Sequence, residues 1–213
     1  MTFKQFWVDP YQTKHGAMVR TAASNEVTLD STIFFAFSGG QESDHGTFNG
    51  IPVISARKEG LDIIYTLPEE AMLCVGEQVE IEIDWARRHR LMQLHFAAEL
   101  VLEIMYKMLP DAEKVGAHIG QDKARIDFGW PQSIAPLLED VAAKANEIIS
   151  ADLAIVSEFE ERETERRYWE IEGFSRVPCG GTHVRSTGEI GRIRLKRENK
   201  GRGKERVEIY LAA

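Results

Sequence analysis

Residues 85–108, WARRHRLMQLHFAAELVLEIMYKM, consist of good helix formers and follow Asp84, a residue suited to capping the N-terminus of a helix. At about 100° per residue, the apolar side chains of this segment form one stripe. The stripe comprises Leu91, Leu94, Ala98, Val101, Leu102 and Met105. His95 lies within the stripe, and Glu99 lies at its edge one turn later, next to His95. A long helix with an apolar face is therefore predicted in the middle of the chain.

The chain before this helix is rich in short β patterns. Runs such as EVTLD (26–30) and LDIIYTL (61–67) contain β-branched residues and are bounded by Gly, Asn, Asp or Pro. VEIEID (79–84) alternates strictly, as a half-buried strand does. We therefore predict a β-rich domain over residues 1–84 and a second domain over residues 85–213.

The second domain mixes helix and strand. Two short strands are expected within residues 116–130, and a second helix over residues 133–156. The expected core face of that helix is Leu137, Leu138, Val141, Ala142 and Ile148. NKGRGK (199–204), between two alternating runs, predicts a hairpin. The fold class is therefore α+β.

Composition excludes several classes of protein. The chain has 213 residues, a net charge of −8 and two cysteines, which argues against a secreted disulfide scaffold and against indiscriminate nucleic-acid binding. It has no apolar run long enough to cross a bilayer, and residues 1–10 lack the pattern of a signal peptide. The glycine-rich loop FSGGQESDHG (37–46) lacks the lysine of a phosphate-binding P-loop. We expect a cytoplasmic protein that is not embedded in a membrane.

The charges are unevenly distributed. Residues 157–173 are acid-rich, whereas RIRLKRENKGRGKER (192–206) is basic. A basic stripe of this kind can contact phosphates, or it can form a solvated edge hairpin whose lysines block strand pairing. Charge alone favours the second interpretation.

Two pairs of side chains are candidates for a metal site. Cys179 and His183 are separated by GGT, whose glycines permit the loop to curl, and His95 and Glu99 share one helix face. Zinc is bound by Cys, His and carboxylate groups, and a catalytic site keeps three protein ligands and one open position. His95 and Glu99 also have structural interpretations, as a buried hydrogen-bonded histidine and a glutamate paired with arginine, and a lone CxxxH pattern is common by chance.

Taken together and in order, these segments resemble the editing domain of alanyl-tRNA synthetases and the free-standing alanyl-tRNA editing proteins. FSGGQESDHG is similar to the family's glycine motif, RRHRLMQLHFAAEL lies where the family has an H-x-x-x-H helix, and CGGTHV followed by TGEIG matches its second zinc motif. Nothing in the chain resembles an aminoacylation domain. The resemblance implies an N-terminal β-barrel-like domain followed by a two-layer α+β editing domain. It also implies an ATP-independent, zinc-dependent deacylase that maintains translation fidelity by acting on mischarged tRNA(Ala), chiefly seryl-tRNA(Ala), with glycyl-tRNA(Ala) as a second candidate.

One residue departs from the family pattern, because Glu99 occupies the position of the second histidine. Glu99 can bind zinc through an oxygen, which predicts a His95, Glu99, Cys179 and His183 ligand set. Alternatively, three residues hold the metal and Glu99 activates a water. A weakened or absent metal is the third possibility. We rank ligation first, because Glu99 stands in a ligand's position.

The resemblance also suggests residues that contact the substrate. His118 and Thr182 are candidates for the amino-acid pocket, with a turn histidine as the alternative for His118. Candidate contacts to tRNA are Gly39, Gly40, Gln41, Lys200, Arg202 and Lys204. Two other functions remain open: a non-catalytic tRNA-binding module with a structural metal, and a zinc deacylase for another aminoacyl-tRNA. A monomer or a homodimer is expected.

Overall fold

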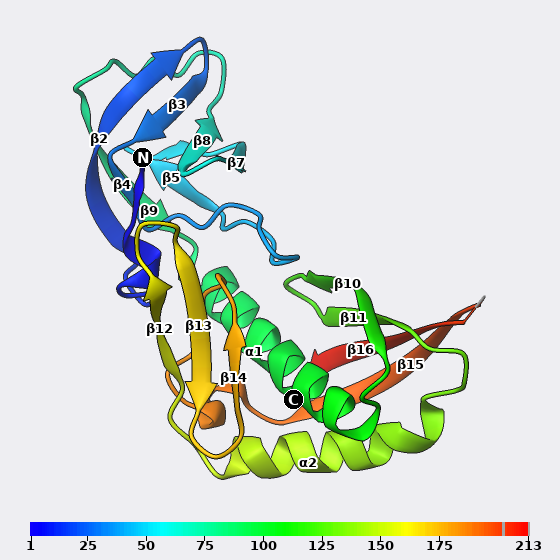
Figure 1. The fold of residues 1–213 in the computed structure, drawn as a ribbon. Helices are drawn as coiled ribbons and strands as arrows, with labels where there is room; N and C mark the ends of the chain where they lie inside the picture. The colour runs from blue at the N-terminus through cyan, green and yellow to red at the C-terminus, as the bar shows by residue number, and fades with distance from the viewer. Residues whose placement is uncertain (202, 213) are drawn as a thin grey trace. The chain divides into compact units, whose positions relative to one another are not determined.

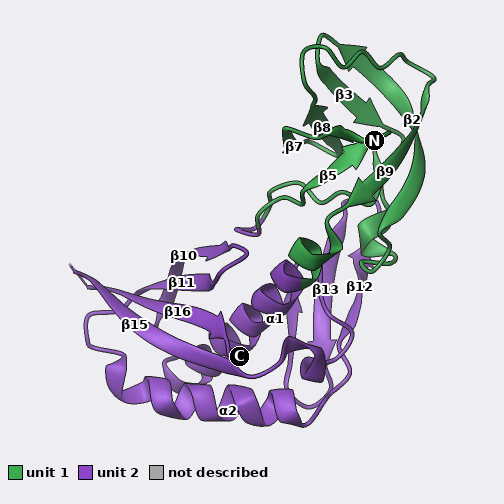
Figure 2. Ribbon diagram, turned by 180° about the vertical axis from the view of Figure 1, so that it is seen from behind, with its two compact units in different colours: residues 1–38, 42–89 green, residues 39–41, 90–213 purple. Residues whose placement is uncertain are grey.

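The structure, a computed structural model, describes residues 1–201 and 203–212. By its internal contacts the chain divides into two compact units, coloured separately in Figure 2. Unit 1 comprises residues 1–38 and 42–89, and unit 2 comprises residues 39–41 and 90–213. The long helix therefore contributes residues to both units, and Gly39–Gln41 belong to unit 2. The two compact units are defined by contacts, so the expected domains, residues 1–84 and 85–213, stay a prediction.

Unit 1 is a curled antiparallel sheet of short strands (Figure 1). Its elements are β1 (Phe3–Lys4), η1 (Gln5–Trp7), β2 (Lys14–Ala23), β3 (Glu26–Leu29), β4 (Ser31–Thr32), β5 (Gly46–Phe48), β6 (Ile51–Pro52), β7 (Ser55–Glu59), β8 (Asp62–Thr66) and β9 (Gln78–Ile83). The main sheet has the order β6-β5-β9-β2-β3-β8-β7, and β1 pairs with β4. A register shift between Val19 and Thr21 lets β2 bend, so that it pairs with β9 before the bend and with β3 after it. The strands predicted before Asp84 are confirmed.

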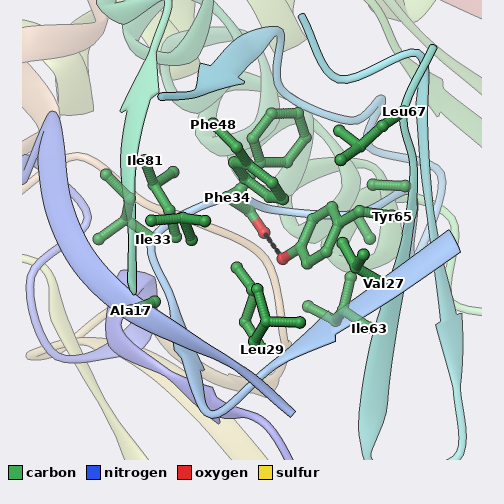
Figure 3. Close-up of a cluster of buried hydrophobic side chains, with 14 of the residues drawn as sticks. Ala17, Val27, Leu29, Ile33, Phe34, Phe48, Ile63, Tyr65, Leu67 and Ile81 are labelled. Carbon is green, nitrogen blue, oxygen red and sulfur yellow. Dashed lines mark hydrogen bonds between the residues drawn. The ribbon is translucent and has the colours of Figure 1, made fainter. Parts of the chain in front are cut away.

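The core of unit 1 lies inside this curled sheet, where apolar side chains converge from several strands (Figure 3). Phe34, Phe48 and Tyr65 pack edge to face, with ring centroids 4.9–6.3 Å apart. The buried hydroxyl of Tyr65 lies 2.8 Å from Thr32 Oγ1 and donates to the carbonyl of Phe34 at 3.2 Å. Aromatic burial with a satisfied hydroxyl gives this small unit its own core.

Within unit 1, the end of the glycine-rich loop, residues 42–46, is held by a buried ion pair. Arg88 and Asp44 are both fully buried, and Arg88 Nε donates to Asp44 Oδ1 at 2.8 Å while its Nη2 contacts Oδ2. Asp44 Oδ2 also accepts the backbone N–H of Phe35 at 2.7 Å. Asp44 is thus a structural anchor of the motif.

Over its described residues, unit 2 contains two antiparallel sheets and two helices. Its elements are α1 (Trp85–Met108, beginning in unit 1), β10 (Glu113–Ile119), β11 (Ala124–Gly129), η2 (Ala135–Leu137), α2 (Leu138–Ser150), β12 (Val156–Glu161), β13 (Arg166–Ile171), β14 (Ser175–Pro178), η3 (Thr187–Ile190), β15 (Ile193–Gly201) and β16 (Lys204–Leu211). The sheets have the orders β10-β11-β16-β15 and β12-β13-β14. Both views show α1 lying between these sheets (Figures 1 and 2). The α+β class is confirmed.

The first helix matches its predicted range, 85–108, and the Asp84 carboxylate accepts the N–H of Arg87 at 3.1 Å, as a cap does. Its predicted stripe is buried, but so are Met92, Phe96 and Ile104 on other faces. Burial on several sides follows from the position of α1 between two sheets. Among the described residues, no helix is long and apolar enough to cross a membrane.

Two expectations for the second domain were wrong. The second helix covers only Leu138–Ser150, because Pro136 lies in a preceding 3₁₀ turn and Asp152, with φ of +48°, follows its end. Of the predicted core face only Val141 is fully buried, and Ala145 and Ile149 are the other buried residues of the helix. The sheet β12-β13-β14 was not predicted at all, because charged residues obscured the alternation of its strands.

Candidate metal centre

The α1 helix supplies the first two side chains of the candidate site. His95 is 4% exposed, and its Nε2 lies 3.3 Å from Oε1 of Glu99, one turn further on. The other carboxylate oxygen of Glu99 accepts the indole N–H of Trp169 at 3.0 Å. The helical spacing recognised in the sequence therefore brings an imidazole nitrogen and a carboxylate oxygen to one point.

The loop after β14 supplies the other two. The N–H of Cys179 donates to the carbonyl of Arg167 at 2.9 Å, and Cys179 Sγ then lies 3.4 Å from His95 Nε2 and 3.3 Å from His183 Nε2. A Cβ atom on Gly181 would lie 2.0 Å from Cε1 of His95, so only glycine allows this loop to cover the imidazole. The CGGTHV loop and α1 therefore meet through a glycine.

These donor atoms fit a tetrahedral metal ion. One ligand atom each from His95, Cys179 and His183 lies within 4.8 Å of the others. At zinc bond lengths, tetrahedral ligands are separated by about 3.4 Å between two nitrogens and about 3.6 Å when one is sulfur. Glu99 is outside that group of three, although its Oε1 lies 3.7 Å from Cys179 Sγ. The structure therefore brings together three residues that could hold a metal ion, with a carboxylate beside them.

The electrostatics of the group also favour a cation. Burial lowers the pKa of His95, but the negative charges of Cys179 and Glu99 outweigh this effect and raise it to about 10. Burial raises the pKa of Glu99, but the hydrogen bond and charge of His95, followed by the Trp169 bond, lower it to about 2. Burial and the charge of His95 hold the pKa of His183 well below its usual value. The negative charges of Cys179 and Glu99 thus keep His95 protonated. A metal ion bound to the same side chains would supply the positive charge instead of that proton.

Outer hydrogen bonds orient both imidazoles. Gln41 Oε1 lies 2.6 Å from His95 Nδ1 and accepts the N–H of Thr182 at 3.3 Å, while Gln41 Nε2 donates to Thr182 Oγ1 at 2.9 Å. His183 Nδ1 lies 2.8 Å from Ser157 Oγ. Because both Nδ1 atoms are engaged, both Nε2 atoms are turned toward Cys179.

The expected substrate residues lie at different depths. Gln41 and Thr182 are 0% and 1% exposed, so their side chains are part of the buried support of His95. The expected contact between Gln41 and tRNA stays a prediction, which this burial does not favour. His118 is partly exposed on β10, next to Ile119, whose N–H donates to the carbonyl of Gly40 at 2.8 Å. Gly40 has φ of +91°, and a Cβ atom there would lie 2.7 Å from the carbonyl oxygen of Ala117. Gly40 thus attaches residues 39–41 to β10 within unit 2.

The basic hairpin is formed by β15 and β16, as predicted. Lys200 and Lys204 are exposed, and Lys200 Nζ lies 3.0 Å from Oε1 of Glu198. Arg202, the third expected tRNA contact of this turn, lies outside the described residues. A hollow of about 770 Å³ lies between α2 and β15. None of His95, Glu99, Cys179 and His183 lines it, so cavity size alone does not locate the candidate metal centre.

Three residues of the unpredicted sheet were missed by the sequence reasoning. Ser157 of β12 contacts His183, Trp169 of β13 contacts Glu99, and buried Arg167 donates to the carbonyl of Gly181 at 3.4 Å. The alternation of RRYWEI, which buries residues 167, 169 and 171, was the available signal. It was hidden because one buried position is an arginine.

Comparison with known proteins finds related sequences along nearly the whole chain. Residues 167–208 match the family model described as the threonyl and alanyl tRNA synthetase second additional domain. The chain is 34% identical to alanyl-tRNA editing protein AlaX-M of Pyrococcus horikoshii, covering 99% of this chain and 98% of that protein. It is 32% identical to AlaX-M of Methanosarcina mazei, covering 99% of this chain and 97% of that protein. It is also 34% identical to alanine–tRNA ligase of Methanopyrus kandleri, covering 86% of this chain but 23% of the ligase.

The match over residues 167–208 relates this part of unit 2 to the second additional domain of threonyl and alanyl tRNA synthetases. Similarity over nearly the whole length of both sequences then identifies the family more closely. The chain belongs to the alanyl-tRNA editing proteins.

Proposed function

We propose that this protein is a free-standing hydrolase that deacylates mischarged tRNA(Ala). Its similarity to alanyl-tRNA editing proteins extends over their full length, whereas it matches about a quarter of an alanine–tRNA ligase. The observation that carries the proposal is the convergence of His95, Cys179, His183 and the Glu99 carboxylate at one point. Such a group suits ester hydrolysis, which needs a cation and a base close together.

We assign Zn²⁺ to this group, held by His95, Cys179 and His183, because two imidazoles and a thiol are donors that zinc prefers. When bound, the ion supplies Lewis acidity to the ester. Glu99 Oε1 lies 3.3 Å from His95 Nε2 and 3.7 Å from Cys179 Sγ, spacings that also suit a fourth ligand, so ligation by Glu99 stays the alternative. We assign Glu99 to water activation, because three protein ligands leave the open position that a catalytic zinc site keeps.

In the proposed reaction, Glu99 orients a water molecule and accepts one of its protons as the water oxygen attacks the ester carbonyl carbon. The bond between that carbon and the ribose oxygen breaks, and a proton returns to the ribose oxygen. The products are the free amino acid and uncharged tRNA. His95 is kept in place by Gln41, and His183 by Ser157, so neither ring needs to reorient during the reaction.

Selection of serine over alanine requires a polar partner for the serine hydroxyl. We assign this role to His118 before Thr182, because His118 is partly exposed, whereas the Thr182 hydroxyl already accepts a hydrogen bond from Gln41. Exposed lysines at the hairpin turn, Lys200 and Lys204, are proposed to contact tRNA phosphates, and Arg202 is proposed as a third contact from the sequence alone. Gly39 and Gly40 are proposed to act indirectly, by fixing Gln41 next to β10 within unit 2.

A deacylation panel tests the proposal. We expect turnover of seryl-tRNA(Ala), weaker turnover of glycyl-tRNA(Ala), none of alanyl-tRNA(Ala), and about one zinc per chain. His183→Ala should abolish zinc binding and turnover, while His45→Ala, which changes an exposed histidine of unit 1, should preserve both. Binding of tRNA without turnover would instead indicate a binding module. Turnover of a different aminoacyl-tRNA would indicate another deacylase, and protein purified without chelator that lacks zinc would refute the metal assignment.

A further inference from the structure

Trp169 lies beside Glu99 and is fully buried. It occupies the middle of β13, the central strand of its sheet, and pairs in register with Ser157 on one side and Val177 on the other. Its ring packs edge to face on Phe96 of α1, with centroids 5.1 Å apart. Sheet pairing and this aromatic contact hold the indole in one position. Phe96, on which it packs, lies one turn of α1 before Glu99.

The indole has one hydrogen-bond donor and no acceptor, and a buried indole N–H needs a partner. Trp169 donates to Glu99 Oε2 at 3.0 Å, while Glu99 Oε1 lies 3.3 Å from His95 Nε2 and 3.7 Å from Cys179 Sγ. The two oxygens of a carboxylate are chemically equivalent, and the terminal torsion of glutamate is soft. The indole therefore distinguishes them, by engaging one and leaving the other toward the metal-binding group.

We propose that Trp169 is a positioning residue for Glu99: its N–H holds Oε2 so that Oε1 alone faces the group of His95, Cys179 and His183. The catalytic meaning of this role rests on the proposed function. The positioning of the Glu99 carboxylate by Trp169 does not depend on that function, because an oriented carboxylate also affects how a cation binds beside it. Glu99 and Trp169 then form a functional pair, and replacing either one removes the contribution of both.

Removal of the donor tests the pair. Trp169→Phe keeps an aromatic ring, and site-specific replacement of Trp169 by benzothienylalanine keeps the ring shape and substitutes sulfur for the N–H. We expect either change to lower kcat for seryl-tRNA(Ala) by roughly 10- to 100-fold with KM nearly unchanged, and to weaken zinc binding measured by chelator competition. Trp130→Phe, a partly exposed tryptophan of unit 2, is the matched control and should alter neither quantity.

The decisive comparison is made in a Glu99→Ala background. Glu99→Ala by itself should lower both kcat and zinc affinity. If Trp169 acts through Glu99, adding Trp169→Phe to this variant should lower each of them by less than about a further twofold. Equal losses in both backgrounds would mean that Trp169 only supports packing, and would overturn the proposal. So would unchanged kcat and zinc affinity in the benzothienylalanine variant. If the wild-type protein hydrolyses no aminoacyl-tRNA, the proposed function fails, whereas the coupling measured with zinc alone still decides the role of Trp169.

Discussion

Gly181→Ala should disable the metal centre without changing any donor atom. The Cβ atom introduced at position 181 would lie 2.0 Å from Cε1, 2.5 Å from Nδ1 and 3.0 Å from Nε2 of the His95 ring. The backbone of Gly181 does not lie in the left-handed region, so the obstacle is this contact and not the conformation of alanine. Gly180→Ala is a matched control, because a Cβ atom at the neighbouring glycine meets nothing within 4 Å.

The geometry sets the size of the effect. Ordinary contact begins at 3.4 Å, so a contact at 2.0 Å requires the loop and the His95 ring to separate by about 1.4 Å. Metal–ligand distances tolerate changes of only about 0.2 Å, so His95 Nε2 and Cys179 Sγ would no longer meet one ion. A misplacement of about 1 Å can cost about 100-fold in rate, and overpacking typically costs about 1–3 kcal/mol of stability.

The assay compares both alanine variants with the wild-type protein in zinc content, in kcat/KM for seryl-tRNA(Ala) and in thermal unfolding. Gly181→Ala should lose zinc and at least about 100-fold in kcat/KM, while remaining folded. Gly180→Ala should change stability by no more than about 0.5 kcal/mol and retain zinc. If Gly181→Ala binds zinc as tightly as Gly180→Ala, then the close approach of the loop to His95 is not what forms the site.

Other perturbations have equally definite outcomes. Asp44→Asn leaves the buried charge of Arg88 without its anion and should lower the free energy of unfolding by about 3–5 kcal/mol in urea titrations, whereas a wild-type midpoint would refute the role of the pair. Gln41→Ala removes the acceptor for His95 Nδ1 and should weaken zinc binding roughly 10- to 100-fold, and an unchanged chelator-competition curve would contradict this. The hydrogen bond from Arg197 lowers the pKa of Glu205 below its usual 4.5. Ionised Glu205 therefore stabilises the folded protein above pH 4.5, and this contribution is lost as the pH falls through the folded-state pKa. Glu205→Gln should therefore flatten the dependence of unfolding temperature on pH below about 5, and an equally steep dependence would count against it.

Local patterns predicted much of the fold. The range of α1 followed from its helix formers and the Asp84 cap, and the strands before Asp84 followed from alternation and breakers. The second helix was overextended, because the segment around Asp152 resembles a helix in composition but has a left-handed backbone there. The sheet β12-β13-β14 escaped prediction because its buried positions include Arg167 as well as Trp169.

The candidate site was predictable only in part. The spacings of His95 with Glu99 and of Cys179 with His183 are local, and the structure brings all four side chains together. Gln41 was expected to meet tRNA, yet the structure buries it beside His95, which lies 54 positions away in the sequence. Contacts across such separations depend on how elements pack, which periodicity does not reveal.

The sequence by itself determined which donor atoms this protein has and in what local pairs, because helical spacing and the short GGT segment constrain residues four apart. Only the tertiary structure decided how those pairs are used. In the folded protein, the CGGTHV loop packs against α1 at Gly181, and Gln41 and Ser157 orient the two imidazoles. Trp169 donates a hydrogen bond to Glu99. The physical reason is that burial makes each of these hydrogen bonds obligatory, and burial is a property of the assembled sheets and helix rather than of any one segment.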